Sequence, residues 1–92
     1  MKHSDGGIFM KQINECLDRF FLKQKPLKKK WSAHQKDNKL YLFHYHHLVL
    51  VFDLIDERIV FEWWEKQADK RGLDAAKMYF STKRNRAISD KL

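Results

Sequence analysis

The sequence predicts one α+β domain in which an N-terminal helix, a three-stranded antiparallel sheet and a C-terminal helix follow one another. Three observations predict it: an apolar stripe with helical spacing near the N-terminus, runs of strand-forming residues in the middle, and a second helical pattern before the C-terminus. The 92 residues suffice for a single domain, 1–92, and we expect residues 1–6 and 87–92 to fray. We expect both helices to cover one sheet face, because an antiparallel sheet can leave its other face in water.

Residues 7–24 have the pattern of an amphipathic helix. Their apolar side chains recur at spacings of three and four: Phe9, Ile13, Cys16, Leu17, Phe20 and Phe21. Lys25 and Pro26 then indicate the end of the helix, because proline cannot continue it. Cys16 lies on the apolar stripe, so we interpret it as a small buried side chain rather than a reactive thiol.

Two strands are predicted after this helix. Residues 31–35 form the first strand, and Asp37 and Asn38 lie in the turn that follows, since both residue types tolerate a left-handed backbone. The next stretch, 40–52, is rich in Leu, Val, Tyr and Phe, but it is longer than a usual strand. We therefore expect a bulge, bend or break at 44–47.

Residues 53–71 permit two interpretations. One is a turn at Asp56 and Glu57 followed by a third strand over 58–64, which is rich in Ile, Val, Phe and Trp. The other is a helix that begins at Asp53 with acidic residues in its first turn. The sequence favours the strand, because its strand-forming residues are adjacent and the helical stripe is irregular.

A second helix is predicted over residues 73–86. Its apolar residues have spacings that let them face a core: Leu73, Ala76, Tyr79 and Phe80. Basic residues gather at its C-terminal end, where the helix dipole favours cations.

Charge is distributed unevenly along the chain. The net charge is +7, with nine Lys and Arg against three Asp and Glu in residues 1–36, two against six in 37–65, and eight against three in 66–92. Segregated charge of this kind attracts phosphate groups or an acidic protein to the basic segments. The acidic middle segment is expected to repel phosphate.

Two basic clusters are the candidate nucleic-acid contacts. The first combines five lysines with an aromatic ring that suits base stacking: Lys23, Lys25, Lys28, Lys29, Lys30 and Trp31. The second lies along the predicted C-terminal helix: Arg71, Lys77, Lys83, Arg84 and Arg86. A solvated loop and a solvated helix end explain the same residues equally well, unless the two clusters meet in space.

Tryptophans and histidines provide two further candidates. Trp63 and Trp64 are adjacent, so on a strand one of them points away from a one-sided core and is an interface or stacking residue. His44 and His46 share one face of a regular strand and are weak metal candidates. We predict no metal site, because no third and fourth ligand has a fixed spacing.

These patterns favour a non-enzymatic module that associates with DNA or RNA. The alternative is a protein-interaction or homodimerisation module that uses an exposed, Trp-bearing sheet face. A small basic ribonuclease, with His44, His46 and His47 as acid–base residues, is the weaker enzymatic alternative. The sequence contains no cofactor-binding motif, signal peptide or membrane-spanning run, which predicts a cytoplasmic protein with no cofactor and no membrane partner.

Overall fold

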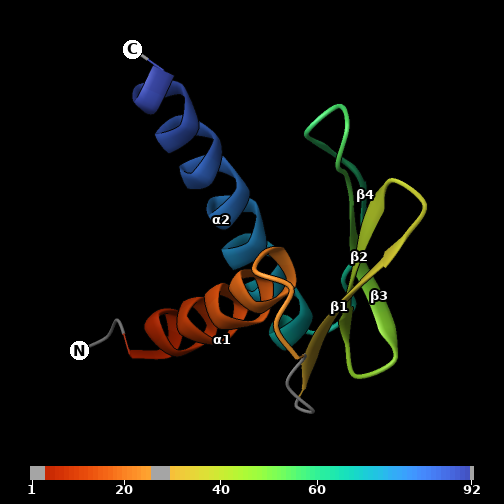
Figure 1. Cartoon of the computed structure of the whole chain (residues 1–92). Coiled ribbons are helices and arrows are strands. Elements are labelled where there is room, and N and C mark those ends of the chain that lie inside the picture. The colour runs from red at the N-terminus through yellow and green to blue at the C-terminus, as the bar shows by residue number, and fades with distance from the viewer. Residues whose placement is uncertain (1–3, 26–29, 92) are drawn as a thin grey trace.

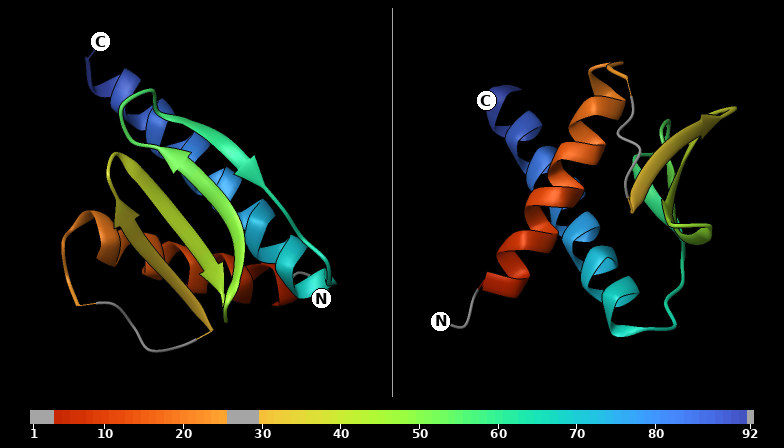
Figure 2. Two further views of the ribbon diagram at one scale, coloured as in Figure 1. Left: turned by 90° about the vertical axis from the view of Figure 1, so that its right-hand side faces the viewer. Right: turned by 90° about the horizontal axis from the view of Figure 1, so that it is seen from below.

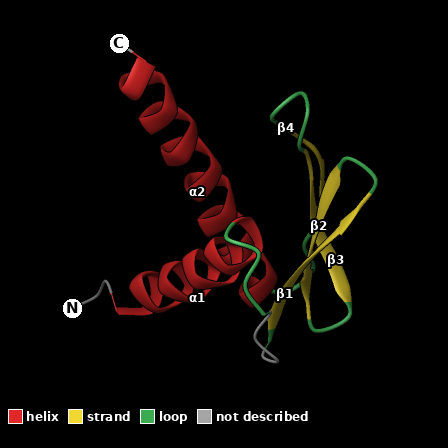
Figure 3. Cartoon of the chain, in the orientation of Figure 1, coloured by secondary structure: helices red, strands yellow, loops and turns green. Residues whose placement is uncertain are grey.

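The computed structural model describes residues 4–25 and 30–91, and the side chains of residues 11–25 and 30–82. Within these residues the chain forms two helices and a four-stranded antiparallel sheet (Figures 1 and 3). In chain order the elements are α1 (Ser4–Phe21), β1 (Trp31–Lys36), β2 (Lys39–His44), β3 (His47–Asp53), β4 (Arg58–Glu62) and α2 (Gln67–Lys91). The α+β class and the helix at each end of the sheet segment are therefore confirmed.

The sheet has one strand more than predicted, because the run 40–52 reverses direction between His44 and His47. Tyr45 adopts a left-handed φ of 58° in this turn, and its backbone N–H donates to the carbonyl of Lys30 over 2.7 Å. The expected break is thus a complete hairpin turn. The sequence did not predict the reversal, because a tyrosine is not a usual left-handed turn residue.

The strands form a meander with the order β1-β2-β3-β4, so the sheet has two distinct ends. One end contains the β1–β2 and β3–β4 turns, and we call it the aspartate end after its acidic residues: Asp37, Asp53, Asp56 and Glu57. The other contains the start of β1, the β2–β3 turn and the end of β4. We call it the histidine end, after His44, His46 and His47.

Both helices lie on one face of the sheet, as predicted (Figure 2). The core lies between the helices and this face, where Leu17, Leu42 and Leu50 are fully buried. Phe80 of α2 stacks on Phe52 of β3, with ring centroids 3.9 Å apart. Burial of these apolar side chains is the main force that holds the helix layer on the sheet.

α1 begins and ends a few residues earlier than predicted. After its last turn Lys23 has a left-handed φ of 58°, and the backbone N–H of Gln24 donates to the carbonyl of Arg19. The N–H of Lys23 donates to the carbonyl of Phe20. This pair of bonds is a Schellman motif, so the backbone already leaves the helix before Pro26.

The segment 53–71 contains a strand and then the start of a helix. β4 (Arg58–Glu62) confirms the favoured strand, although it ends two residues before the predicted limit. α2 begins six residues earlier than predicted, at Gln67. Asp69 stabilises this early start, because its carboxylate accepts a hydrogen bond from the N–H of Lys66 just before the helix.

The helices extend into the terminal segments for which fraying was predicted. α1 begins at Ser4 and α2 ends at Lys91, while residues 1–3 and 92 lie outside the described part of the chain. Over the residues that the structure describes, neither helix combines the length and apolar character needed to cross a membrane.

Candidate functional site

The histidine end contains a buried histidine–aspartate pair. The Nδ1 atom of His44, the last residue of β2, lies 2.6 Å from Oδ1 of Asp69 in the first turn of α2. The side chains are only 10% and 2% exposed. Because an ionised carboxylate only accepts hydrogen bonds, the ring donates through Nδ1. This contact fastens the start of α2 to the sheet.

Asp69 also binds the backbone that leads into α2. Its Oδ2 atom accepts hydrogen bonds from the N–H of Lys66 over 3.0 Å and from the N–H of Glu65 over 3.2 Å. Burial disfavours the charged carboxylate, but the Lys66 N–H, the His44 ring and the Glu65 N–H outweigh burial and lower the pKa of Asp69. The carboxylate is therefore ionised at neutral pH while it joins the sheet to the helix.

Trp31, the first residue of β1, completes this buried cluster. Its ring stacks on the His44 ring, with centroids 4.3 Å apart and planes 19° apart. The ring also packs against Gly72 of α2, where an added Cβ would lie 2.0 Å from the nearest ring atom. Trp31 is only 3% exposed, and its Nε1 has no hydrogen-bond partner among the described residues. Trp31 is thus a core residue and is not available as the stacking platform that the sequence suggested.

Exposed rings surround the buried cluster. Tyr45 is 60% exposed, and Trp63 and Trp64 are 36% and 44% exposed. His47 lies edge-on to Trp63 with centroids 5.5 Å apart, and the Lys70 Nζ lies 5.8 Å from the centre of the Trp64 ring. β4 ends before the two tryptophans, so they do not alternate along a strand as predicted, and both retain exposed surface.

The first basic cluster is divided between two places. Lys23 and Lys25 are exposed after the end of α1, which packs against the middle of α2. Lys30 is exposed at the histidine end, immediately before β1. Lys28 and Lys29 lie outside the described residues.

The two members of the second basic cluster with described side chains, Arg71 and Lys77, point in different directions. They are six residues apart in the helix, so their directions differ by about 120° around its axis. Lys77 forms an ion pair of 3.2 Å with Glu62 of β4. The other three members lie in α2 beyond the last described side chain: Lys83, Arg84 and Arg86.

One part of each basic cluster comes together at the histidine end. Trp31, which follows Lys30, packs against Gly72, which follows Arg71. The segments that carry these two cations are therefore in contact, although they are far apart in the sequence. This contact partly answers the question that the sequence left open, whether the two clusters meet.

Two exposed residues of the histidine end were missed in the sequence: Lys66 and Tyr45. Lys66 lies beside the buried pair, because its backbone N–H binds Asp69. Tyr45 lies in the β2–β3 turn, with its ring 4.8 Å from that of His44. Neither has a sequence signal of its own, because both positions depend on where β2 and β4 end.

The histidines do not form the arrangement that a regular strand predicts. His44 is buried, whereas His46 lies beyond the strand end and is exposed, so the two do not share one face. Among the described residues, no three His, Cys, Asp or Glu side chains gather in a way that would hold a metal ion. The enclosure of His44 by Asp69 and Trp31 argues against the acid–base role that a ribonuclease would require.

Cys16 is buried in α1, as its place on the apolar stripe predicts. Burial, followed by the neighbouring Glu15 carboxylate, raises the pKa of Cys16 to about 11. The thiol is therefore protonated at neutral pH and packs as a small apolar side chain.

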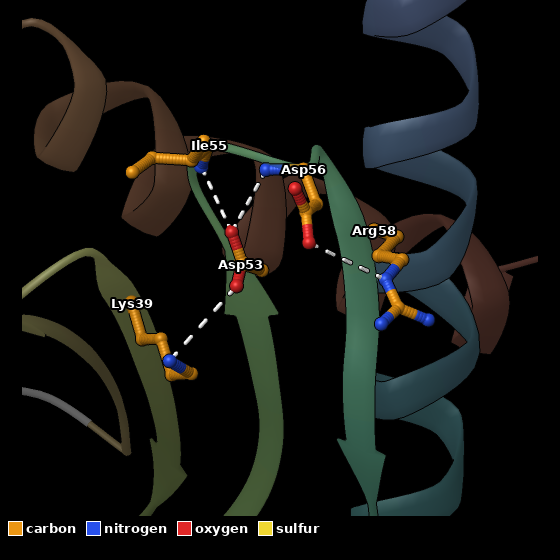
Figure 4. A network of polar contacts seen from close by, with 5 residues as sticks. All are labelled: Lys39, Asp53, Ile55, Asp56 and Arg58. Carbon is orange, nitrogen blue, oxygen red and sulfur yellow. Dashed lines mark hydrogen bonds and ion pairs between the residues drawn. The ribbon is translucent and has the colours of Figure 1, made fainter.

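The aspartate end is organised by local hydrogen bonds (Figure 4). The Oδ1 atom of Asp53 accepts from the N–H of Asp56 over 2.8 Å and from the N–H of Ile55 over 2.9 Å. The Asp56 N–H is the main cause of the lowered pKa of Asp53; partial burial opposes it, and the Ile55 N–H and Lys39 assist it. Lys39 Nζ lies 3.9 Å from Asp53, and Arg58 Nε lies 3.9 Å from Asp56, so carboxylates compensate both cations.

No protein-family model, curated protein or solved structure matches this chain.

Proposed function

We propose that this chain is a non-enzymatic nucleic-acid-binding module that holds a phosphate backbone at the histidine end. The observation that carries the proposal is the packing of Trp31 on Gly72, which brings the segments of Lys30 and Arg71 together. Cations that share one surface create a stronger local potential than the same charges spread along a chain. Phosphate groups bind such a surface with release of counterions.

The exposed side chains of this end suit nucleic acid. Lys30 and Lys66 are exposed, and neither forms an ion pair with another described residue. The nearest buried carboxylate, Asp69, already has His44 as its partner. Tyr45 is exposed beside these cations and offers a ring on which a base can stack.

Binding of a labelled oligonucleotide at two salt concentrations tests the proposal. By fluorescence anisotropy, affinity should fall steeply between about 50 and 200 mM salt. The double variant Lys30→Glu with Lys66→Glu should weaken binding, and on a single strand it should reduce the salt slope by about 0.7 for each phosphate that is no longer neutralised. The matched control is Lys11→Glu with Lys25→Glu, the same charge change at two exposed positions in and just after α1, which should have a much smaller effect.

Two results would contradict the proposal. One is a dissociation constant that does not change between the two salt concentrations. The other is equal weakening by the two double variants, since net charge alone would then explain the binding.

A protein-interaction surface on β4 is a second candidate function. This strand is an edge of the sheet, and its Val60 and Phe61 are 42% and 41% exposed. An exposed apolar edge strand pairs readily with another chain. A salt-independent dimer in sedimentation velocity, which Val60→Lys converts to a monomer, would support this candidate. A chain that stays monomeric at high concentration would count against self-association.

A further inference from the structure

The sheet face opposite the helices carries an ordered array of apolar and aromatic side chains. This face is turned toward the viewer in the left view of Figure 2, with both helices behind the sheet. Strand alternation relative to the buried core residues places two rows of seven residues on it, and we call these rows the outer face: Ser32, His34, Tyr41, Phe43, Leu48, Val51 and Phe61. A third row, Lys36, Lys39, Asp53 and Arg58, borders them at the aspartate end.

The rings of the outer face are arranged in rows. One row crosses all four strands through successive register partners: His34, Tyr41, Val51 and Phe61. A second row, about 7 Å nearer the histidine end, contains Ser32, Phe43 and Leu48. Phe61 is 41% exposed, and Tyr41 and Phe43 are half-buried. The rows therefore present ring surface to solvent next to the cations of the histidine end.

Among the described residues, neither of these two rows contains a carboxylate, although the segment 37–65 contains six acidic residues. The nearest, Asp53, lies in the bordering row, where Lys39 is 3.9 Å away. Four of them lie at the aspartate end: Asp37, Asp53, Asp56 and Glu57. Glu62 turns toward Lys77 of α2, and Glu65 lies between β4 and α2. The expected repulsion of phosphate by the middle segment stays a prediction, but its carboxylates lie outside the two rows of the outer face.

We infer that the outer face binds single-stranded nucleic acid, with bases stacked on Phe43, Tyr41 and Phe61 and the backbone continuing onto the histidine end. The inference rests on the proposed function and adds the form of nucleic acid that is bound. Bases of a single strand are free to stack on aromatic rings, whereas bases of a duplex are already stacked on one another. Phe43 precedes His44, so the aromatic rows adjoin the lysines that would contact phosphates.

Charge favours this occupant over a second copy of the chain. A second copy carries the same net charge of +7, which opposes association through a face that adjoins lysines. A nucleic-acid strand brings both the opposite charge and flat rings that match the aromatic side chains.

Phe61→Leu is the test variant, because it removes the ring and retains apolar area at an exposed edge position. Anisotropy is measured with labelled oligothymidine and with a duplex of the same length. The wild-type chain should prefer the single strand, and Phe61→Leu should weaken single-strand binding about tenfold with little change for the duplex. The matched control is Ile55→Ala, which removes a 68% exposed apolar side chain at the aspartate end and should bind as the wild type does.

Ultraviolet crosslinking of a bromouracil-containing single strand gives a second measurement on the unmodified chain. Crosslinks at Tyr41, Phe43 or Phe61, located by mass spectrometry, support the inference, and crosslinks confined to the helices overturn it. Equal affinity for duplex and single strand, or unchanged binding by Phe61→Leu, overturns the inference but leaves the proposed function intact. A dimer that Phe61→Leu dissociates without any change in binding would assign the face to a second copy. Salt-independent binding of both probes would overturn the proposed function as well.

Discussion

The histidine and aspartate ends of the sheet use the same hydrogen-bonding device in different surroundings. At each end one aspartate, Asp69 or Asp53, accepts hydrogen bonds from two backbone N–H groups. Asp69 also binds the buried ring of His44, whereas Asp53 lies 3.9 Å from Lys39, whose side chain is 42% exposed. The carboxylate therefore closes a local turn at the aspartate end and joins the sheet to a helix at the histidine end.

Exclusion of water makes these two arrangements unequal in energy. Charged groups in the interior interact more strongly, and removal of one partner leaves the other unsatisfied. Exposed ion pairs are screened by water and salt and contribute little. We therefore expect the histidine end to dominate the stability of the fold.

Asp69→Ala is expected to change the stability of the fold more than any other variant considered. This change leaves His44 and two N–H groups without their acceptor, and should lower the free energy of unfolding by about 3 kcal/mol. Urea denaturation followed by circular dichroism measures the loss. The matched variant Asp53→Ala should cost clearly less, and equal losses would show that burial does not distinguish the two ends.

Gly72→Ala should have the next largest effect. Alanine normally stabilises a helix relative to glycine, but here its Cβ would collide with the Trp31 ring. We expect a net loss of about 2 kcal/mol from overpacking, measured by the same urea denaturation. Ser81→Ala, at an exposed position of α2, is the control and should be nearly neutral. A stabilised Gly72→Ala variant would contradict the Trp31–Gly72 contact.

A smaller effect is expected on the pH dependence of stability. The folded state lowers the pKa of Asp69, so this residue stabilises the fold above its unfolded pKa of about 3.9 and loses that contribution as the pH falls through its folded pKa. Asp69→Asn should therefore flatten the acid side of the stability profile, measured by urea denaturation from neutral pH to about pH 2. Asp53, whose pKa is also lowered, should make a separate contribution that Asp53→Asn removes. An unchanged acid profile in Asp69→Asn would contradict an ionised carboxylate beside His44.

The smallest expected effect is on the labelling of Cys16. With a pKa of about 11 and a buried position, this thiol should react with disulfide reagents only when the helix layer opens. Asp69→Ala should accelerate labelling under native conditions, because it detaches the start of α2, whereas Asp53→Ala should change the rate little. Fast labelling of the wild-type chain would show that α1 is not packed as described.

Elements with a local pattern were the ones predictable from the sequence. The apolar stripe around Cys16 and the strand-forming run at Arg58–Glu62 depend on neighbours within a few residues, and both are present. The β2–β3 hairpin was not predictable in the same way, because it places Tyr45 in a backbone conformation that its residue type does not favour. The early start of α2 was missed because its cap is Asp69, inside the helix, with no usual capping residue before it.

The residue types of the candidate site were predictable from the sequence, but the individual residues that belong to it were not. Lys30 and the tryptophan pair are exposed at the histidine end, and their contact with a nucleic acid or a protein stays a prediction. Trp31 and Lys77 have the same residue types as useful contacts, but one is in the core and the other is paired with Glu62. A charged or aromatic residue has no sequence mark that distinguishes a partner within the fold from a partner outside it.

By itself, the sequence determined the α+β class, the helical and strand periodicities and the segregation of charge along the chain. Only the tertiary structure decided which of those charges share a surface. The contact of His44 with Asp69 joins residues 25 positions apart, and it depends on the turn after β2 and on the register of the whole sheet. The same register places Asp53 beside Lys39, in the row that borders the aromatic rows of the outer face. Local periodicity arises from short-range geometry, whereas such pairings require every intervening turn to be known.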